Sequence, residues 1–136
     1  LTLIPSASST PREALSRSRT SPGQFMTVEI ENDGRRVKRS YTIASSPTRQ
    51  EYVEISVKRE EHGIVSRALH DTLADGDELT LSAPSGTFTF TGEGEDSIVL
   101  VSGGVGITPM MSGPRVGGPH LSPALLPDHR RFLLPR

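Results

Sequence analysis

Three runs of alternating apolar and polar residues, separated by turn signals, restrict the fold of this sequence more than any other feature. The runs are QFMTVEIE (24–31), RRVKRSYTIA (35–44) and EYVEISVKR (51–59). In the third run, Val53, Ile55 and Val57 recur at every second position, which is the period of a β-strand. Asn32-Asp33-Gly34 separates the first two runs, and Ser45-Ser46-Pro47 ends the second. The sequence therefore predicts three short strands joined by turns.

One helix is predicted between the third run and two further strands. In IVSRALHDTLA (64–74), Val65, Leu69 and Leu73 recur at four-residue spacing, which predicts a helix of about three turns. ELTLSA (78–83) and GTFTFT (86–91) follow as two short strands. Short strands at close spacing with one inserted helix are typical of a small antiparallel Greek-key barrel.

The pattern changes after residue 96. SIVLVS (97–102) is continuously apolar, as expected for a strand buried on both faces of a parallel sheet, and it leads directly into GGVGITPMM. This order is the opening of a βαβ unit. No helix pattern continues it, because the following residues contain prolines at 114, 119, 123, 127 and 135, which would break a helix interior.

These patterns divide the chain into four parts. We expect an irregular N-terminal segment at 1–20, a barrel at 21–92, the start of a nucleotide-binding domain at 97–112 and an irregular proline-rich tail at 113–136. The predicted fold class is mainly β: a small antiparallel barrel with one short helix, followed by the first strand and glycine-rich turn of an incomplete α/β domain.

Composition excludes several classes of site and partner. The chain of 136 residues has no cysteine, which rules out disulfides, thiolate metal ligands and cysteine nucleophiles within it. The formal net charge is −1, with +2 over residues 1–20 and +3 over 113–136, so residues 21–112 carry −6. An acidic middle argues against nucleic acid as the main partner. No apolar run is long enough for a membrane span, and we expect neither a span nor a signal peptide.

The stretch RSYTIASSP (39–47) combines groups that could hold a flat, negatively charged ligand. Arg39 presents a rigid fork of donors that suits phosphate, and the ring of Tyr41 offers a flat surface for stacking. A hydroxyl such as that of Thr42 can donate to or accept from a heterocycle nitrogen. Taken alone, however, this stretch fits an ordinary strand edge with a core-packed tyrosine better than a binding site.

Two further stretches allow both a binding and a purely structural interpretation. Gly63 permits close approach of a ligand, and Ser66 lies near the predicted helix start, where free N–H groups favour anions, yet Ser66 could equally be a plain helix cap. Lys58 could simply be solvated, and for His70 we expect a surface or helix-end role. The glycine-rich turn after residue 102 permits close approach of a dinucleotide but lacks the usual GxGxxG spacing.

The order of these motifs resembles that of the ferredoxin–NADP reductase superfamily, whose members have an FAD-binding barrel followed by a pyridine-nucleotide domain. The motifs that carry the resemblance are PGQFMTVEI, RSYTIASSP, VKREEHGIVSRALH, GDELTLSAPSGTFTF and IVLVSGGVGITPMM, which together cover about residues 21–112. LTLIP then resembles a remnant of a first barrel strand. The family pattern stops near Ser112, so we expect a chain truncated within the NAD(P) domain.

On the flavin side, the resemblance implies a role for each residue of the RSYT motif. Arg39 would hold the phosphate or ribityl region of FAD, Tyr41 would lie against the isoalloxazine ring, and Thr42 would hydrogen-bond near its N5 atom. Ser40 belongs to the same motif, and Phe25 lies close to the same pocket in relatives.

On the dinucleotide side, the resemblance implies three groups of contacts. Val57 and Lys58 would line the adenosine of FAD. The pyrophosphate would be bound by Gly63, Ile64, Val65 and Ser66. The nicotinamide-dinucleotide turn would consist of Gly103, Gly104, Val105 and Gly106, with Thr108 facing the flavin and the nicotinamide.

The resemblance implies an NAD(P)H-dependent flavin oxidoreductase that passes electrons through FAD to an iron–sulfur, haem or oxygenase partner outside this chain. The cofactors would be FAD and, in the intact parent, NAD(P)H. We nominate no catalytic acid–base residue and no metal ligand, and we expect a cytoplasmic location. The alternative is a flavin-binding or interaction module without redox turnover.

Overall fold

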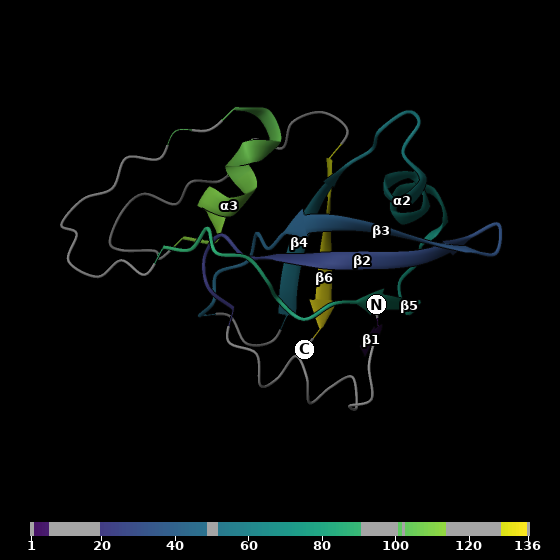
Figure 1. The fold of residues 1–136 in the computed structure, drawn as a ribbon, viewed down its shortest axis with the longest axis horizontal. Helices are drawn as coiled ribbons and strands as arrows, with labels where there is room; N and C mark the ends of the chain where they lie inside the picture. Colours follow the sequence, from purple (N-terminus) through teal and green to yellow (C-terminus); the bar gives the residue numbers. More distant parts are fainter. Residues whose placement is uncertain are drawn as a thin grey trace.

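The computed structural model describes residues 2–5, 20–48, 52–90, 101, 103–113 and 129–135. Within these ranges the chain forms two sheets, one of four strands in the order β1-β5-β2-β3 and one of two strands, β4-β6. In Figure 1 the strands β2 and β3 run across the view, and β4 and β6 cross them steeply. The described structure is thus mainly β, as the sequence patterns predict.

A long hairpin forms the centre of the larger sheet. β2 (Phe25–Asn32) and β3 (Arg35–Thr42) pair antiparallel along their whole lengths, from Phe25 opposite Thr42 to Asn32 opposite Arg35. The two turn residues have positive φ, 50° at Asp33 and 71° at Gly34. Two such residues make the turn that matches strand twist, which explains why the chain carries Asp-Gly here.

Two short strands complete the larger sheet. β5 (Glu78–Leu81) pairs antiparallel with β2, with Val28 opposite Leu81. β1 (Thr2–Pro5) pairs parallel with β5, so the LTLIP stretch contributes a strand.

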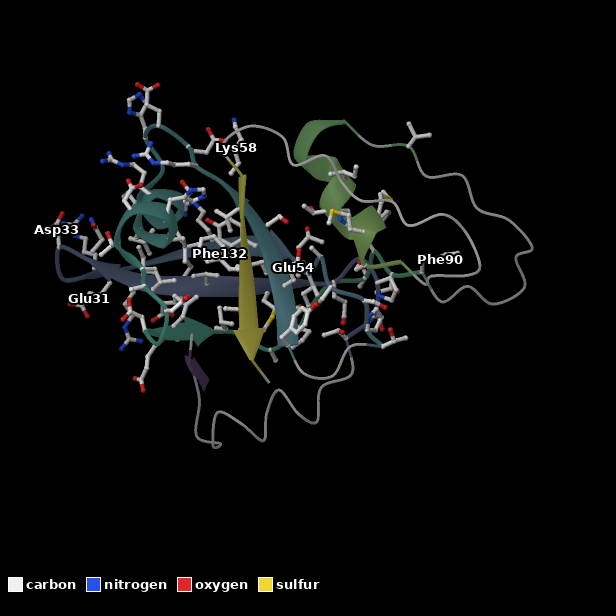
Figure 2. The ribbon with its side chains drawn as sticks, turned by 180° about the vertical axis from the view of Figure 1, so that it is seen from behind. Glu31, Asp33, Glu54, Lys58, Phe90 and Phe132 are labelled. Carbon is white, nitrogen blue, oxygen red and sulfur yellow. The ribbon has the colours of Figure 1, made fainter. Side chains whose placement is uncertain are left out.

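The second sheet consists of β4 (Tyr52–Lys58) and β6 (His129–Pro135), which pair antiparallel over seven residues on each strand. The end of β3 links this sheet to the first, because Ile43 forms a bridge with Ile55 and the N–H of Ala44 donates to the Glu54 carbonyl at 2.7 Å. Figure 2 shows β6 lying alongside β4 when the molecule is seen from behind.

The helical segments lie at opposite ends of the hairpin (Figures 1 and 2). α2 (Ile64–Arg67) continues into a wider π-helical turn, η1 (Ala68–Thr72), which is closed by a bond from the Leu73 N–H to the Ala68 carbonyl at 3.0 Å. At the other end, η2 (Gly104–Ile107) is a 3-10 turn that leads into α3 (Thr108–Met111).

One hydrophobic core lies between the sheets and α2. The side chains of Val53, Ile55 and Val57 are fully buried, as their alternation predicts. The other members of the core are Met26, Val28, Ile43, Val65, Leu69, Leu79, Leu81 and Leu134. The strands β2, β4, β5 and β6 contribute to this core, and Val37 and Tyr41 of β3 pack against it.

Two expectations from the sequence are wrong. The tail at 113–136 is not irregular throughout, because its residues 129–135 form β6, which gains main-chain partners along the edge of β4. Residues 86–90 do not form a strand, although GTFTFT alternates. They make single contacts with the Pro22-Gly23 turn, such as the bond from the Phe90 N–H to the Pro22 carbonyl at 3.3 Å, and Phe88 is 69% exposed.

Other expectations hold in part. The predicted helix over 64–74 is confirmed as a helical segment that ends at Thr72, two residues early, because Leu73 is already extended. The predicted strand at 97–102 lies outside the described residues except for Val101, which is 84% exposed.

We predict that Gly23→Ala destabilises the fold more than Gly34→Ala does. Both glycines have positive φ, so alanine should cost about 1 kcal/mol at either position. A Cβ at Gly23 would also collide with the Phe88 carbonyl oxygen, whereas a Cβ at Gly34 would meet nothing within 4 Å. Urea denaturation of the two variants measures the difference. Equal losses of unfolding free energy would show that the Gly23–Phe88 contact does not constrain the fold.

Candidate functional site: a flavin seat along strand β3

The residues of the RSYT motif lie at the end of β3, and the strand pairing decides which way they face. Arg39 lies opposite Val28 and Tyr41 lies opposite Met26. Because paired residues share a face, Arg39 and Tyr41 belong to the core-facing side of the sheet. Tyr41 is half-buried and packs against the core, and Arg39 is exposed. A cation and an aromatic ring therefore stand side by side at the margin of the core.

Ser40 and Thr42 belong to the opposite face by alternation. The Ser40 hydroxyl lies 3.0 Å from that of Thr27 on β2, so it is engaged within the sheet. β3 ends at Thr42, and the next residue, Ile43, donates its N–H to the Gln24 carbonyl at 2.9 Å outside the regular ladder. Because Thr42 is still paired with Phe25 in the ladder, Tyr41 and Thr42 lie on opposite faces of the sheet, and contact of both with one ligand stays a prediction.

The electrostatics of Arg39 and Tyr41 suit an anionic ligand. Burial raises the pKa of the Tyr41 phenol, an effect that the nearby Arg39 partly opposes, so the phenol is neutral at pH 7 and can donate a hydrogen bond. The Arg39 guanidinium donates to the Lys38 carbonyl at 2.7 Å through one nitrogen. A guanidinium has five N–H groups, so donors remain for a phosphate.

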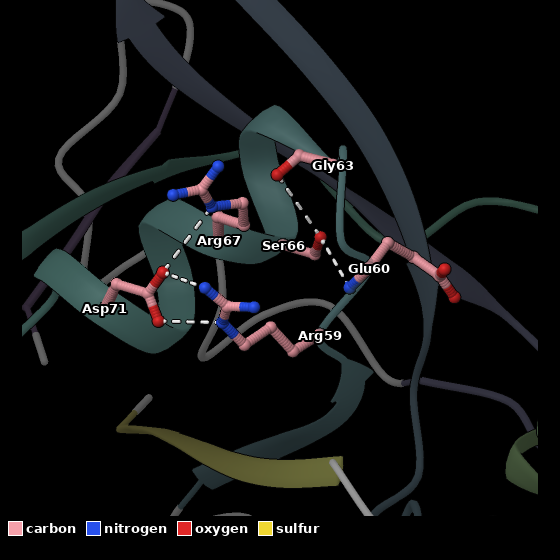
Figure 3. Close-up of polar contacts among 6 residues, drawn as sticks. All are labelled: Arg59, Glu60, Gly63, Ser66, Arg67 and Asp71. Atoms are coloured by element: carbon pink, nitrogen blue, oxygen red, sulfur yellow. Dashed lines mark hydrogen bonds and ion pairs between the residues drawn. The ribbon is translucent and has the colours of Figure 1, made fainter.

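The loop between β4 and α2 is held by an ion-pair network (Figure 3). Arg59 donates to both carboxylate oxygens of Asp71, at 2.9 and 2.7 Å, and Arg67 lies 3.6 Å from the same carboxylate. These contacts lower the pKa of Asp71, chiefly through the Arg59 hydrogen bonds. Two-pronged pairing of this kind fixes geometry as well as charge. It ties the end of β4 to the far end of the helical segment.

Ser66 holds the same loop from inside. Its hydroxyl accepts from the Glu60 N–H at 3.2 Å and lies 3.5 Å from the Gly63 carbonyl, and the residue is only 6% exposed (Figure 3). A Cβ at Gly63 would collide with the Ser66 hydroxyl and would stand 3.0 Å from the Glu60 Cβ. Glycine is therefore required at position 63 by the packing of Ser66. A direct bond from the Ser66 hydroxyl to a pyrophosphate stays a prediction.

The start of α2 presents backbone donors. The first helical bond runs from the Arg67 N–H to the Gly63 carbonyl at 3.1 Å, so the N–H groups of Ile64, Val65 and Ser66 are not used within the helix. The Ile64 side chain is 46% exposed, and that of Val65 is in the core. A pocket of about 350 Å³ lies here, lined by Asn32, His62, Gly63, Ile64, Arg67, Ala68, Asp71 and Thr72.

Val57 and His70 have roles that sequence reasoning missed. The Val57 side chain is fully buried, so only its backbone could line a ligand. Its carbonyl lies 2.8 Å from Nε2 of His70, which must carry the proton because a carbonyl only accepts. The His70 ring also meets Phe132 of β6 edge to face, with centroids 5.9 Å apart. His70 thus links the helical segment to β4 and β6. In the sequence, its place near the end of the predicted helix is the only sign of such a role.

Lys58, the next predicted residue, is exposed at the end of β4. Its ammonium group pairs with Glu60 at 2.9 Å. Because both partners are solvent-exposed, this ion pair contributes little stability, and the lysine can exchange it for a ligand contact.

The glycine-rich turn lies beyond the end of β3 that is far from α2. Ser112, after α3, is 1% exposed; its hydroxyl accepts from the Gly23 N–H at 3.0 Å and donates to the Pro109 carbonyl at 2.8 Å. Gly23 precedes β2, whose first residue, Phe25, lies opposite Thr42. These contacts place the end of α3 beside the end of β3.

Within the turn itself, Gly103 and Gly106 are exposed, and a Cβ on either would meet nothing within 4 Å. Gly104 and Val105 lie in η2, and Thr108 is the half-buried first residue of α3. Packing within the described chain does not require glycine at 103 or 106, which leaves open space for a ligand to approach.

β3 thus connects the two predicted halves of the site. α2 contacts β2 and β3, and the pocket at its start includes Asn32 at the hairpin end, whereas the Gly103–Thr108 segment lies toward the Thr42 end (Figure 1). Arg39 and Tyr41 lie between them. The described residues contain no group of three or more carboxylate or imidazole side chains placed to hold a metal ion. None of the described helices is long and apolar enough to cross a membrane.

We predict that the stabilising effect of Asp71 depends on pH. Because its pKa is lowered in the folded state, the ion pair should stabilise the fold at all pH values above the unfolded pKa, about 4, and lose this effect as pH falls through the folded value. In urea denaturation, Asp71→Asn should therefore be less stable than the parent at pH 7 and converge with it once the pH has fallen below the folded value. Asp75→Asn, at an exposed turn position, is the control. A difference that did not change with pH would contradict the ion-pair account.

Comparison with known proteins agrees with this arrangement. A family model described as the oxidoreductase FAD-binding domain matches residues 11–90. The chain is 50% identical over 91 residues to the glycine betaine monooxygenase reductase subunit of Pseudomonas aeruginosa, covering 67% of this chain and 25% of that protein. It is 46% identical over 99 residues to a flavohemoprotein of Halalkalibacterium halodurans, covering 67% and 24%.

A solved structure shows the same fold. The flavohem-like FAD/NAD-binding domain of nitric oxide dioxygenase from Vibrio cholerae superposes with a TM-score of 0.63 at 38% identity, covering 70% of this chain and 42% of that one. The chain spans about a quarter of the length of the curated relatives it matches. Its described strands, helix and motif order, together with the match over residues 11–90, show that this chain belongs to the oxidoreductase FAD-binding domain family.

Proposed function

We propose that this chain binds FAD and forms the FAD-binding part of an NAD(P)H-dependent oxidoreductase that delivers electrons to a one-electron acceptor on another module. The observation that carries the proposal is the position of β3. Its Arg39 and Tyr41 stand on the core-facing side of the sheet, with the α2 pocket toward one end and the glycine-rich turn toward the other. Family membership supports the same cofactor.

The residues present fit FAD in chemistry as well as in order. Arg39 and the N–H groups of Ile64, Val65 and Ser66 at the start of α2 would hold the phosphates, since both are hydrogen-bond donors. The neutral Tyr41 ring would cover the isoalloxazine, and Thr42 would bond near its N5 atom. Lys58 and the backbone of Val57 would line the adenosine.

The glycine-rich segment would receive the nicotinamide nucleotide. Gly103 and Gly106 have open surroundings, and Gly104, Val105 and Thr108 lie in the same short helical stretch. FAD, when bound, supplies the chemistry of accepting a hydride and releasing electrons one at a time. The protein's part is to hold the two nucleotides in contact, and Ser112 contributes by tying α3 to the turn before β2.

The relatives suggest the kind of acceptor. One of them is a reductase subunit of a monooxygenase and another is a flavohemoprotein, so we propose an oxygenase or haem module outside this chain, working in the cytoplasm. We also propose an iron–sulfur module as an alternative acceptor.

A second candidate is a flavin-binding or interaction module without redox turnover. It is favoured by one observation: Val101 is 84% exposed, and Gly103 and Gly106 face open space. The described residues therefore present one side of a nicotinamide site and no opposing wall. The two candidates differ in their response to NADH and share the FAD site.

We predict that Arg39→Ala weakens FAD binding by about 10-fold or more, because hydrogen bonds to a charged group contribute about 1.5–3 kcal/mol. Arg36→Ala is the matched control, since Arg36 lies on the same strand but on the opposite face and is 78% exposed beside Glu29. Titration of each purified chain with FAD, followed by quenching of flavin fluorescence, gives the two affinities. Equal effects of the two substitutions would remove Arg39 from the phosphate site.

We predict that the FAD-loaded chain by itself is reduced by NADH only slowly, because the residues that the structure describes form only one side of the proposed nicotinamide site. Stopped-flow absorbance at the flavin band measures the rate. Rapid bleaching would contradict this prediction and would favour the first candidate for this chain alone. A yellow protein that does not respond to NADH would favour the second.

A further inference from the structure

The strand β6 pairs with β4 through contacts that do not require the two strands to be close in the sequence. It pairs with β4 from Tyr52 opposite Pro135 to Lys58 opposite His129. On its other side, β4 contacts the segment that follows β3. The contacts are the Ile43–Ile55 bridge, the bond from the Ala44 N–H to the Glu54 carbonyl and the bond from the Glu54 N–H to the Ser45 hydroxyl. β4 thus offers one long edge, and a segment far away in the sequence fills it.

Two side chains of β6 pack into the core beside the outer edge of β4. Leu134 lies opposite Val53 and is fully buried, as Val53 is. Phe132 lies opposite Ile55, packs against the core and meets the His70 ring edge to face at 5.9 Å. An extended segment with an aromatic residue and an aliphatic residue two positions apart therefore completes both the sheet and the core.

These contacts are of the kind by which one chain adds a strand to another. Main-chain hydrogen bonds supply the affinity, and pockets for alternate side chains supply the selectivity. A segment near a chain end can make the same contacts whether it comes from its own chain or from an identical one. The intervening residues contain Pro114, Pro119, Pro123 and Pro127, which cannot extend the ladder and so set the segment apart.

We propose that the outer edge of β4 is a strand-docking site and that the segment 129–135 of a second copy of this chain can occupy it in place of the chain's own β6. The docking edge shares Val57 and Lys58 of β4 with the adenosine contacts proposed above, but its test needs no flavin. The intramolecular strand competes at an effective concentration in the millimolar range, so exchange is favoured at high protein concentration.

The absence of cysteine from the sequence makes a direct test possible. Ser56 lies opposite Arg131 in the β4–β6 register. A Ser56→Cys chain and an Arg131→Cys chain, mixed at about millimolar concentration and mildly oxidised, should form a mixed disulfide when the strands exchange. Ser40→Cys, at an exposed position on β3, replaces Ser56→Cys in the control mixture. We expect at least about a 10-fold excess of the mixed disulfide over the control; equal yields would overturn the proposal.

A labelled peptide of residues 129–136 provides a second measurement on the full chain. It should bind saturably to the parent and about 10-fold more tightly to the Leu134→Asp chain, whose own strand is weakened by a buried charge. If that variant fails to fold, binding of the peptide to the parent chain alone still tests the proposal. A peptide carrying Leu134→Asp, or one with the same residues scrambled, should bind at least 10-fold more weakly. Failure of the native peptide to bind the parent, or equal binding of the scrambled peptide, would overturn the proposal.

Discussion

The full-length register between β2 and β3 is the interaction on which the rest of the structure depends. It places Met26, Val28 and Ile30 on one side of the sheet and thereby places Tyr41, Arg39 and Val37 on the same side. A shift by one residue would send Arg39 and Tyr41 to the solvent face and expose the core residues of β2. The Asp33-Gly34 turn holds this register because both residues adopt positive φ. Core formation and the orientation of the candidate flavin seat are therefore consequences of the same pairing.

The part of the candidate site at the start of α2 is held by polar contacts. The ion pairs of Arg59 and Arg67 with Asp71, the Ser66 hydroxyl under Gly63, and the His70 bond to the Val57 carbonyl fix the loop that follows β4 against the helical segment. The Arg59–Asp71, Glu60–Ser66 and Val57–His70 contacts join β4 and the loop after it to the helical segment, and the Arg67–Asp71 pair lies within that segment. The loop can therefore present backbone donors in one conformation, which reduces the entropy lost when an anion binds.

The sequence predicts the local positions of the candidate site residues better than their contacts. Arg39 and Tyr41 lie on the strand, and Gly63 in the loop before the helix, that the patterns predict, because strand alternation and turn chemistry are local properties. Val57 was expected at the ligand through its motif, yet its side chain is in the core, and Ser66 is committed to its own loop. For His70 the expectation is a surface or helix-end role, and the residue does lie in the last turn of the helical segment. Its role depends on Val57 and Phe132, which are distant in the sequence, and no periodicity reports such a contact.

By itself, the sequence determined the positions of β2, β3, β4 and β5, the hairpin turn, the helical segment after Gly63 and the order of motifs that marks the family. Each of these follows from periods of two or about four residues and from turn chemistry within a few positions. Only the tertiary structure decided that residues 129–135 form a strand and that residues 86–90 do not. The physical reason is that a strand exists only where another strand offers an unpaired edge. β4 offers one to the tail, whereas residues 86–90 make isolated contacts with the Pro22-Gly23 turn and with Phe25.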